Sequence, residues 1–194
     1  HELPEHPRFD ADGDAVADRF GRRFAALKIA GDRITRHPLT TANAITRLDT
    51  GDEAYAAMIA AISAAQRSII LETYIFDRDG IGLRFAQALI DATRRGVAVR
   101  VLIDAVGARY SVPSIVNDLR EGGVPTRVFN GRIITGLRLP YANLRTHRKI
   151  LVVDGAVAFV GGMNIRQGFS AEFAGAAMAH DTHFRVEGPV IADI

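Results

Sequence analysis

Between residues 44 and 129 the sequence alternates short runs rich in apolar and β-branched residues with longer segments of helical character. The short runs have the length and composition of strands and lie at 44–48, 68–76, 97–104 and 126–129. The helical segments lie between them, at 52–65, 81–95 and 113–121, and Thr50 or Asp52 is expected to cap the first of them. An alternation of strands and helices predicts an α/β fold in which the helices pack on a sheet.

The run at 97–104 is almost continuously apolar, as expected of a central strand that is buried on both faces. We therefore expect a mixed, largely parallel β-sheet flanked by helices on both faces. The chain has 194 residues, of which 48% are hydrophobic, and this is enough for one domain with its own core. It contains no cysteine, which excludes disulfides and thiolate metal sites.

The first 43 residues have a different pattern. After an irregular lead-in at 1–13, a helix is expected from residue 14 to about residue 30, with apolar residues at helical spacing and several basic residues around them. A basic amphipathic helix can lie on an anionic membrane surface, or it can cover its own domain. We divide the chain into an N-terminal lead-in with an amphipathic helix, 1–43, and a second unit, 44–194.

The chemistry is concentrated in the stretch from His147 to Asp154. Residues 147–153 predict a strand, and Asp154-Gly155 predicts a hairpin turn. Because side chains alternate along a strand, His147 and Lys149 are expected on one face, together with Leu151 and Val153. Asp154 lies on the turn, out of step with that face, and is expected to hold the hairpin and the nearby backbone.

A second polar group, Gly161-Gly162-Met163-Asn164, follows the next predicted strand at 156–160. The two glycines would let the backbone approach a ligand closely, and Asn164 offers an amide donor. An imidazole is a nucleophile that is largely neutral at pH 7, while an ammonium and an amide stabilise charge on phosphoryl oxygens. His147, Lys149 and Asn164 therefore predict phosphoryl transfer. The carboxylate that fixes the histidine tautomer is expected from Asp181, Glu187 or Glu72.

The spacing His147-x-Lys149-x4-Asp154, followed by Gly-Gly-x-Asn, resembles the signature of the phospholipase D superfamily. The segments 69–76, 95–104, 161–164 and 186–189 resemble its bacterial cardiolipin synthase branch, and the resemblance extends from about residue 44 to residue 194. It implies that 44–194 is a phospholipase D-like catalytic lobe, and that two such lobes pair around one active site. Since the sequence has only one motif, we expect either the first half of a two-motif enzyme or a homodimer subunit.

The resemblance also implies a catalytic set, namely His147, Lys149, Asp154, Asn164 and Asp181. His147 would form a phosphohistidine or act as the acid–base partner, Lys149 and Asn164 would bind phosphate, and Asp181 would orient the histidine. No metal or other cofactor is implied. The implied reaction is transfer of a phosphatidyl group between phospholipids, such as phosphatidylglycerol, by a peripheral enzyme on the cytoplasmic side of the bacterial inner membrane.

Other functions are compatible with the same residues. A phospholipase D-type phosphodiesterase would hydrolyse the lipid, and a single-motif homodimer could be a metal-independent nuclease. The sequence lacks a basic stripe interleaved with aromatic residues, so a nucleic acid is not the expected partner. A non-catalytic assembly lobe would tend to lose the residues that are intact here. Residues 130–143 mix apolar side chains with arginines, and we expect them either to touch acyl chains and headgroups or to pack under the second lobe.

Overall fold

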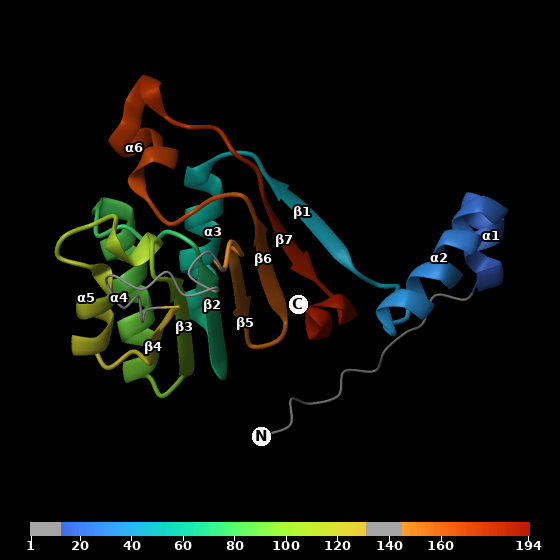
Figure 1. The fold of residues 1–194 in the computed structure, drawn as a ribbon, viewed down its shortest axis with the longest axis horizontal. Helices are drawn as coiled ribbons and strands as arrows, with labels where there is room; N and C mark the ends of the chain where they lie inside the picture. The colour runs from blue at the N-terminus through green and yellow to red at the C-terminus, as the bar shows by residue number, and fades with distance from the viewer. Residues whose placement is uncertain (1–12, 131–144) are drawn as a thin grey trace, which may run out of the picture.

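The computed structural model describes residues 13–130 and 145–194. In these residues seven strands form one sheet in the order β1-β7-β6-β5-β2-β3-β4 (Figure 1). The strands are β1 (Ala44–Leu48), β2 (Ser68–Thr73), β3 (Ala98–Asp104), β4 (Thr126–Phe129), β5 (Ile150–Val153), β6 (Val157–Gly161) and β7 (His183–Glu187). The predicted α/β class with a mixed sheet is confirmed.

The prediction of a largely parallel sheet is wrong. Only the pairs β2–β3 and β3–β4 are parallel, and the four pairs from β1 to β2 across the sheet are antiparallel. The reason lies in the connections. Parallel neighbours need a crossover, which the helices α4 (Gly80–Arg94) and α5 (Ile115–Glu121) provide. In contrast, β5 and β6 are joined by a tight hairpin, and β1 pairs with the distant β7.

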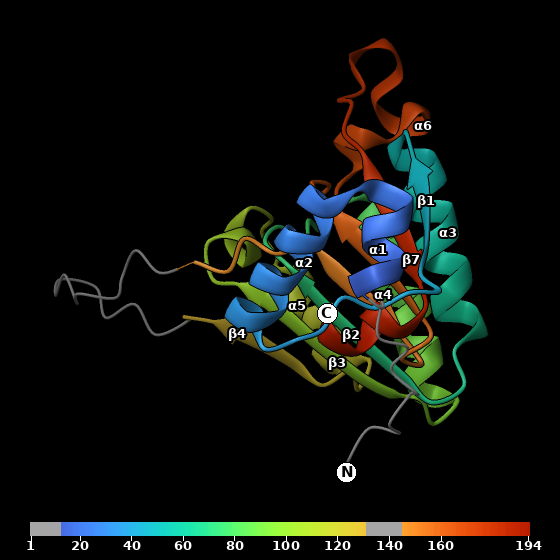
Figure 2. The same cartoon turned by 90° about the vertical axis from the view of Figure 1, so that its right-hand side faces the viewer.

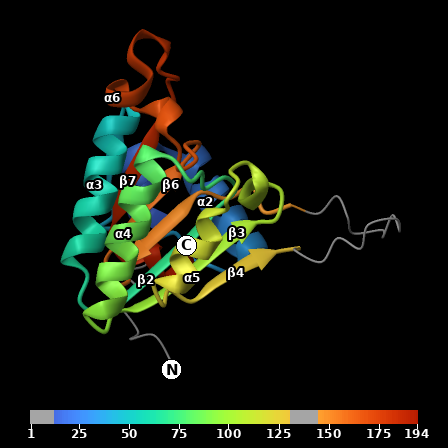
Figure 3. The ribbon, with the colours of Figure 1, turned by 90° about the vertical axis from the view of Figure 1, so that its left-hand side faces the viewer.

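Three helices cover one face of the sheet (Figure 3). They are α3 (Gly51–Ala64), α4 (Gly80–Arg94) and α5 (Ile115–Glu121), and each begins at a side-chain cap, on Thr50, Asp79 and Ser114 respectively. Their apolar sides and the inward side chains of the central strands form one buried core, in which Phe85 and Leu89 of α4 are fully buried. The cap on Thr50 is one of the two that the sequence predicted.

The second face differs from the prediction of helices on both sides. On that face lies a short 3-10 helix, η4 (Pro189–Asp193), whose Ile191 packs with Ala158 and Val186 in a small apolar cluster. The helices α1 (Gly13–Phe20) and α2 (Arg22–Thr35) lie on this side, but no residue of α2 is buried (Figure 2). One helix was predicted for this segment. Gly21, with a φ of 86°, separates the two.

The remaining short elements are η1 (Gly107–Arg109), η2 (Gln167–Phe169), α6 (Ala171–Ala174) and η3 (Gly175–Ala177). None of the helices in the described ranges is long and apolar enough to cross a bilayer. The loop predicted at 130–143 lies, except for its first residue, outside the described residues.

Most of the residues singled out in the sequence lie at one edge of the sheet, where the strands end. The carboxyl ends of β2, β3 and β6 meet the amino ends of β5 and β7 there. The reason is that β5 is antiparallel to its two neighbours, β2 and β6, and that β7 is antiparallel to β6. The strand predicted at 147–153 is shorter in the structure, because residues 145–149 run up to β5 without pairing. The polar residues singled out in the sequence therefore enter this edge from several directions.

Candidate active site

His147 and Lys149 meet at this edge around the ring of Tyr74. The ring centroids of His147 and Tyr74 are 4.8 Å apart, and the ammonium of Lys149 lies 5.2 Å from the centre of the tyrosine ring. Lys149 Nζ also donates to the carbonyl oxygen of His147, at 2.8 Å. Tyr74 follows β2 directly, and the sequence analysis did not single it out.

The two side chains differ in exposure. Lys149 is 6% exposed and shares its buried side with Leu151 and Val153, as the alternation along the strand predicted. His147 is exposed, because it precedes the paired part of β5 and the alternation does not reach it. The site thus offers an accessible imidazole next to a sheltered ammonium, which is the arrangement that an attack on a charged phosphodiester needs.

The segment before His147 is held by acidic side chains from β2 and β3. Asp104 is fully buried, and its carboxylate accepts hydrogen bonds from the backbone N–H of Thr146 (3.1 Å) and of Val106 (2.8 Å). The hydroxyl of Thr146 donates to Glu72. Glu72 was one of the carboxylates considered for the histidine, but the hydrogen bond that the structure gives it is with Thr146. Asp104 and Thr146 were not predicted as site residues.

Two hydrogen bonds hold Asn164, one to its side chain and one to its backbone carbonyl. Its Oδ1 accepts from the N–H of Ile75 at 3.1 Å, and its carbonyl oxygen accepts from the hydroxyl of Tyr55 at 2.6 Å. Because Oδ1 is held by the main chain, the amide nitrogen with its two N–H groups is the part of Asn164 that can face a substrate. The structure thus orients the donor that the sequence predicted.

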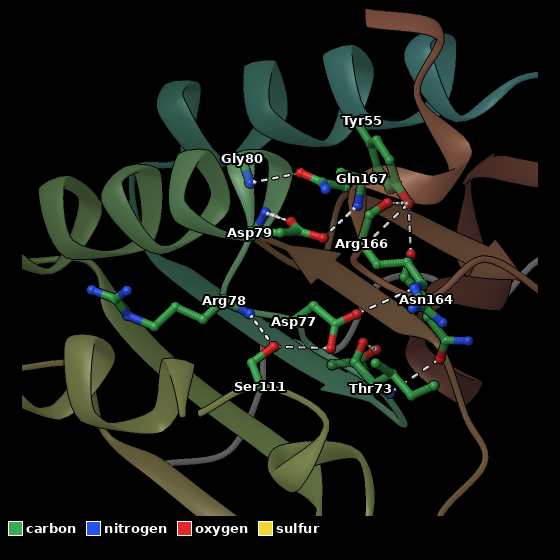
Figure 4. A network of polar contacts seen from close by, with 12 residues as sticks. Tyr55, Thr73, Asp77, Arg78, Asp79, Gly80, Ser111, Asn164, Arg166 and Gln167 are labelled. Carbon is green, nitrogen blue, oxygen red and sulfur yellow. Dashed lines mark hydrogen bonds and ion pairs between the residues drawn. The ribbon is translucent and has the colours of Figure 1, made fainter. Parts of the chain in front are cut away.

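A polar network supports this arrangement from the helix side (Figure 4). The Tyr55 hydroxyl also reaches the carbonyl oxygen of Arg166, and the Arg166 guanidinium lies 3.2 Å from the carboxylate of Asp77. Further along, Asp79 accepts from the N–H of Gln167 at 2.7 Å. Burial raises the pKa of Tyr55, which keeps its hydroxyl a donor. The chain after β2 and the chain after β6 are thereby joined.

The glycine pair makes room for two neighbouring side chains. A Cβ on Gly162 would overlap the carboxylate of Asp181, and a Cβ on Gly161 would lie 2.5 Å from Nδ1 of His183. Gly161 pairs with His183 across β6 and β7, so the missing side chains make room for these two residues. That the backbone of these glycines also lets a ligand approach closely stays a prediction.

Asp181 lies where its charge acts on several neighbours. Burial lowers the pKa of Lys149, and the negative charge of Asp181 opposes this shift. Burial also lowers the pKa of His183 to about 4, again against the charge of Asp181, so this 1% exposed imidazole is neutral at pH 7. Neither ring nitrogen of His183 has a hydrogen-bond partner among the described residues.

Asp154 lies at the opposite end of β5, about 16 Å along the extended chain from Lys149. Its carboxylate accepts from the backbone N–H of Gln66, Arg67 and Ser68, at 2.9, 2.7 and 2.7 Å. Partial burial works to raise the pKa of Asp154, but these three hydrogen bonds outweigh it and the pKa is lowered. Asp154 therefore ties the hairpin to the start of β2.

Glu187 lies at this same distant end, paired with Val157, and its carboxylate accepts from Arg185 at 2.9 Å. Of the three carboxylates considered for the histidine, Asp181 is the one whose negative charge acts on Lys149. In the described ranges no group of three or more potential metal-binding side chains gathers. That the chemistry needs no metal stays a prediction.

Known proteins are similar to this chain in sequence and in fold. Residues 58–181 match the family described as "Cardiolipin synthase, PLD-like domain". Cardiolipin synthase B from Salmonella typhi is 40% identical over 153 residues, which make up 78% of this chain and 37% of that protein. The chain therefore spans little more than a third of the length of the curated relatives that it matches.

Two solved structures share the fold. The phospholipase D family member Nuc from Salmonella typhimurium has a TM-score of 0.57, covers 78% of this chain and 88% of its own, and is 21% identical. The phosphatidylserine synthase of Haemophilus influenzae has a TM-score of 0.60, covers 77% and 34%, and is 17% identical. The family match covers more than half of the chain and includes His147, Lys149, Asn164 and Asp181. The chain therefore belongs to the cardiolipin synthase family of phospholipase D-like domains.

Proposed function

We propose that residues 44–194 form one catalytic lobe of a phosphatidyltransferase of the phospholipase D type, preceded by a lead-in at 1–43. The observation that carries the proposal is the accessible His147 imidazole next to the sheltered ammonium of Lys149, with the Asn164 amide held in a fixed orientation. These are the groups that a phosphoryl transfer through a phosphohistidine requires.

The reaction has two balanced steps. In the first, a nitrogen lone pair of one histidine bonds to phosphorus while the bond from phosphorus to the leaving alcohol breaks, and that oxygen takes a proton from a second histidine. In the second, the acceptor hydroxyl gives a proton to the second histidine and attacks phosphorus, and the phosphorus–nitrogen bond breaks. His147 takes one of these two roles, and a second lobe supplies the other histidine.

The other groups stabilise charge and orientation. The ammonium of Lys149 and the N–H groups of Asn164 bind the non-bridging phosphoryl oxygens. Asp181 orients the histidine, and its negative charge also acts on Lys149. Asp154 acts through the fold, since its carboxylate is bound to the backbone at the other end of β5.

The substrates are phospholipids, and the second lobe comes from the rest of a longer protein or from a second copy. The names of the curated relatives support phospholipid substrates. The need for a second lobe is supported by the small share of their length that the chain spans. The enzyme works as a peripheral protein at the cytoplasmic side of the inner membrane of a bacterium. Hydrolysis of the lipid is the second candidate, since water could replace the acceptor alcohol. Nucleic acid stays among the substrates to be tested, because the sequence is also compatible with a single-motif nuclease.

The test uses the full-length protein with phosphatidylglycerol vesicles in EDTA, and mass spectrometry of the lipids. Cardiolipin and free glycerol support the transferase, whereas phosphatidic acid alone identifies a hydrolase. If no lipid is consumed, single- and double-stranded DNA are tested next. His147→Ala abolishes turnover if the mechanism is right, and near-normal activity in that variant contradicts it. The matched control is His37→Ala, an exposed histidine whose ring lies 3.0 Å from Asp193.

A further inference from the structure

The helices α1 and α2 present large apolar side chains to solvent. Phe20, Phe24, Leu27 and Ile34 are each more than half exposed, and Ile34 is 82% exposed. The rings of Phe20 and Phe24 lie 6.2 Å apart, so the two helices contribute to one apolar patch. A contiguous patch of this kind, unlike a single exposed leucine, indicates an interaction surface.

The patch lies on a side of α2 that the rest of the described chain leaves uncovered. Phe24, Leu27 and Ile34 follow each other at intervals of three and seven, which places them along one side of a helix. The partly buried residues Lys28 and Asp32 lie on the adjoining side, next to Phe24, where they form an ion pair at 2.6 Å. Asp32 also accepts from the N–H of Leu39 at 2.9 Å, which ties this inner side to the chain that follows.

The charge of this segment differs from that of the rest of the chain. Residues 13–36 contain six basic and three acidic residues, a net charge of +3, while the whole chain has a formal charge of +2. Residues 1–12 contain one basic and four acidic residues, a net charge of −3, and residues 37–194 carry +2. The positive charge of the N-terminal segment is therefore confined to the helix pair, where five of the six basic residues are exposed arginines: Arg19, Arg22, Arg23, Arg33 and Arg36.

We infer that α1 and α2 dock on the surface of an anionic phospholipid bilayer. The apolar patch of Phe20, Phe24, Leu27 and Ile34 enters the boundary between headgroups and acyl chains, and the exposed arginines bind headgroup phosphates. The five exposed arginines favour this occupant, because guanidinium groups beside an apolar patch match a bilayer with anionic headgroups, whereas an apolar protein partner would not require them. The inference rests on the proposed function, and it assigns the contact with the membrane to residues outside the catalytic edge.

The experiment measures binding of the full-length His147→Ala protein to vesicles by flotation, so that no lipid is consumed. One set of vesicles is phosphatidylcholine, and the other contains phosphatidylglycerol as well. We expect binding to the anionic vesicles only, and weaker binding at high salt. The triple variant Phe24→Ser, Leu27→Ser, Ile34→Ser should lose binding by at least about tenfold. Leu83→Ser, an exposed leucine on α4, is the matched control and should bind normally.

Three results would overturn the inference. They are equal binding to neutral and anionic vesicles, undiminished binding of the triple variant, and a fall in the melting temperature of the triple variant. The last would mean that the patch is covered by another part of the protein, because an exposed patch contributes little to folding. In the His147-intact background, the triple variant should still turn over short-chain phosphatidylglycerol in solution. Loss of docking and failure of the proposed chemistry are thereby distinguished.

Discussion

Replacing Asp154 separates its role in the fold from a role in the chemistry. Asp154 belongs to the sequence motif, yet its carboxylate binds three backbone N–H groups at the start of β2, at the far end of β5 from Lys149. If this contact is its function, Asp154→Ala should destabilise the protein and leave the turnover of the folded enzyme close to normal. Replacing a catalytic group should instead abolish turnover and leave the stability of the fold close to normal.

The contacts of Asp154 give the size of the expected loss in the free energy of unfolding. A hydrogen bond to a charged group contributes about 1.5–3 kcal/mol when its loss leaves a buried partner unpaired. Only Ser68 is partly buried, while Gln66 and Arg67 are exposed and water can replace the lost acceptor. The hydrogen bond from Ser68 is therefore expected to contribute about 1.5 kcal/mol to the free energy of unfolding, and those from Gln66 and Arg67 about 0.5 kcal/mol each. The total is about 2–3 kcal/mol. Asp154 also has a φ of 55°, which costs alanine about 1 kcal/mol more.

The assay is urea unfolding followed by far-ultraviolet circular dichroism. Asp154→Ala should lose about 3–4 kcal/mol and Asp154→Gly about 2–3 kcal/mol, since glycine accepts the positive φ. The matched control is Asp49→Ala, an exposed aspartate in an ion pair with Arg47, which should lose at most about 1 kcal/mol. Unchanged stability of Asp154→Gly, together with lost turnover, would refute the structural role.

Three further substitutions test the site. Gly162→Ala forces the Asp181 carboxylate to move, so turnover should fall by at least about tenfold, while Gly168→Ala, which meets no neighbouring atom within 4 Å, should be normal in the same assay. Tyr55→Phe removes a hydroxyl that binds two carbonyl oxygens, and urea unfolding should show a loss of about 1–2 kcal/mol with a lower kcat. Because the pKa of His183 is about 4 when folded and about 6.5 when unfolded, its neutral form stabilises the fold above pH 6.5. That contribution, up to about 3 kcal/mol, should be lost as the pH falls toward 4, and His183→Phe should flatten this part of the stability profile. A profile identical to that of the parent protein would contradict the assignment.

Much of the local structure could be predicted from the sequence. The strands and helices between residues 44 and 129, the cap on Thr50 and the hairpin at Asp154 agree with the structure to within a few residues. These features depend on short-range physics: the period of apolar residues, the chemistry of caps and the turn residues. The spacing of His147, Lys149 and Asn164 likewise identified the family, since a motif is a property of the chain itself.

Segments that pair across long distances could not be predicted in the same way. The strand β7 was missed, because only His183 and Val186 within it are buried and its sequence lacks a clear alternation. The directions of the strands were misjudged for a related reason, since the partner of β1 lies about 140 residues away and no local signal marks it.

The chain by itself determined most of the elements, the family and the polar residues that we propose carry the chemistry. The tertiary structure decided how they are used. It brought Tyr74 and Asp104 to the site, filled the space beside Gly161 and Gly162 with His183 and Asp181, and placed Asp154 at the far end of its strand. The physical reason is that a residue type sets what a side chain can do, whereas the pairing and packing of distant segments set what it meets.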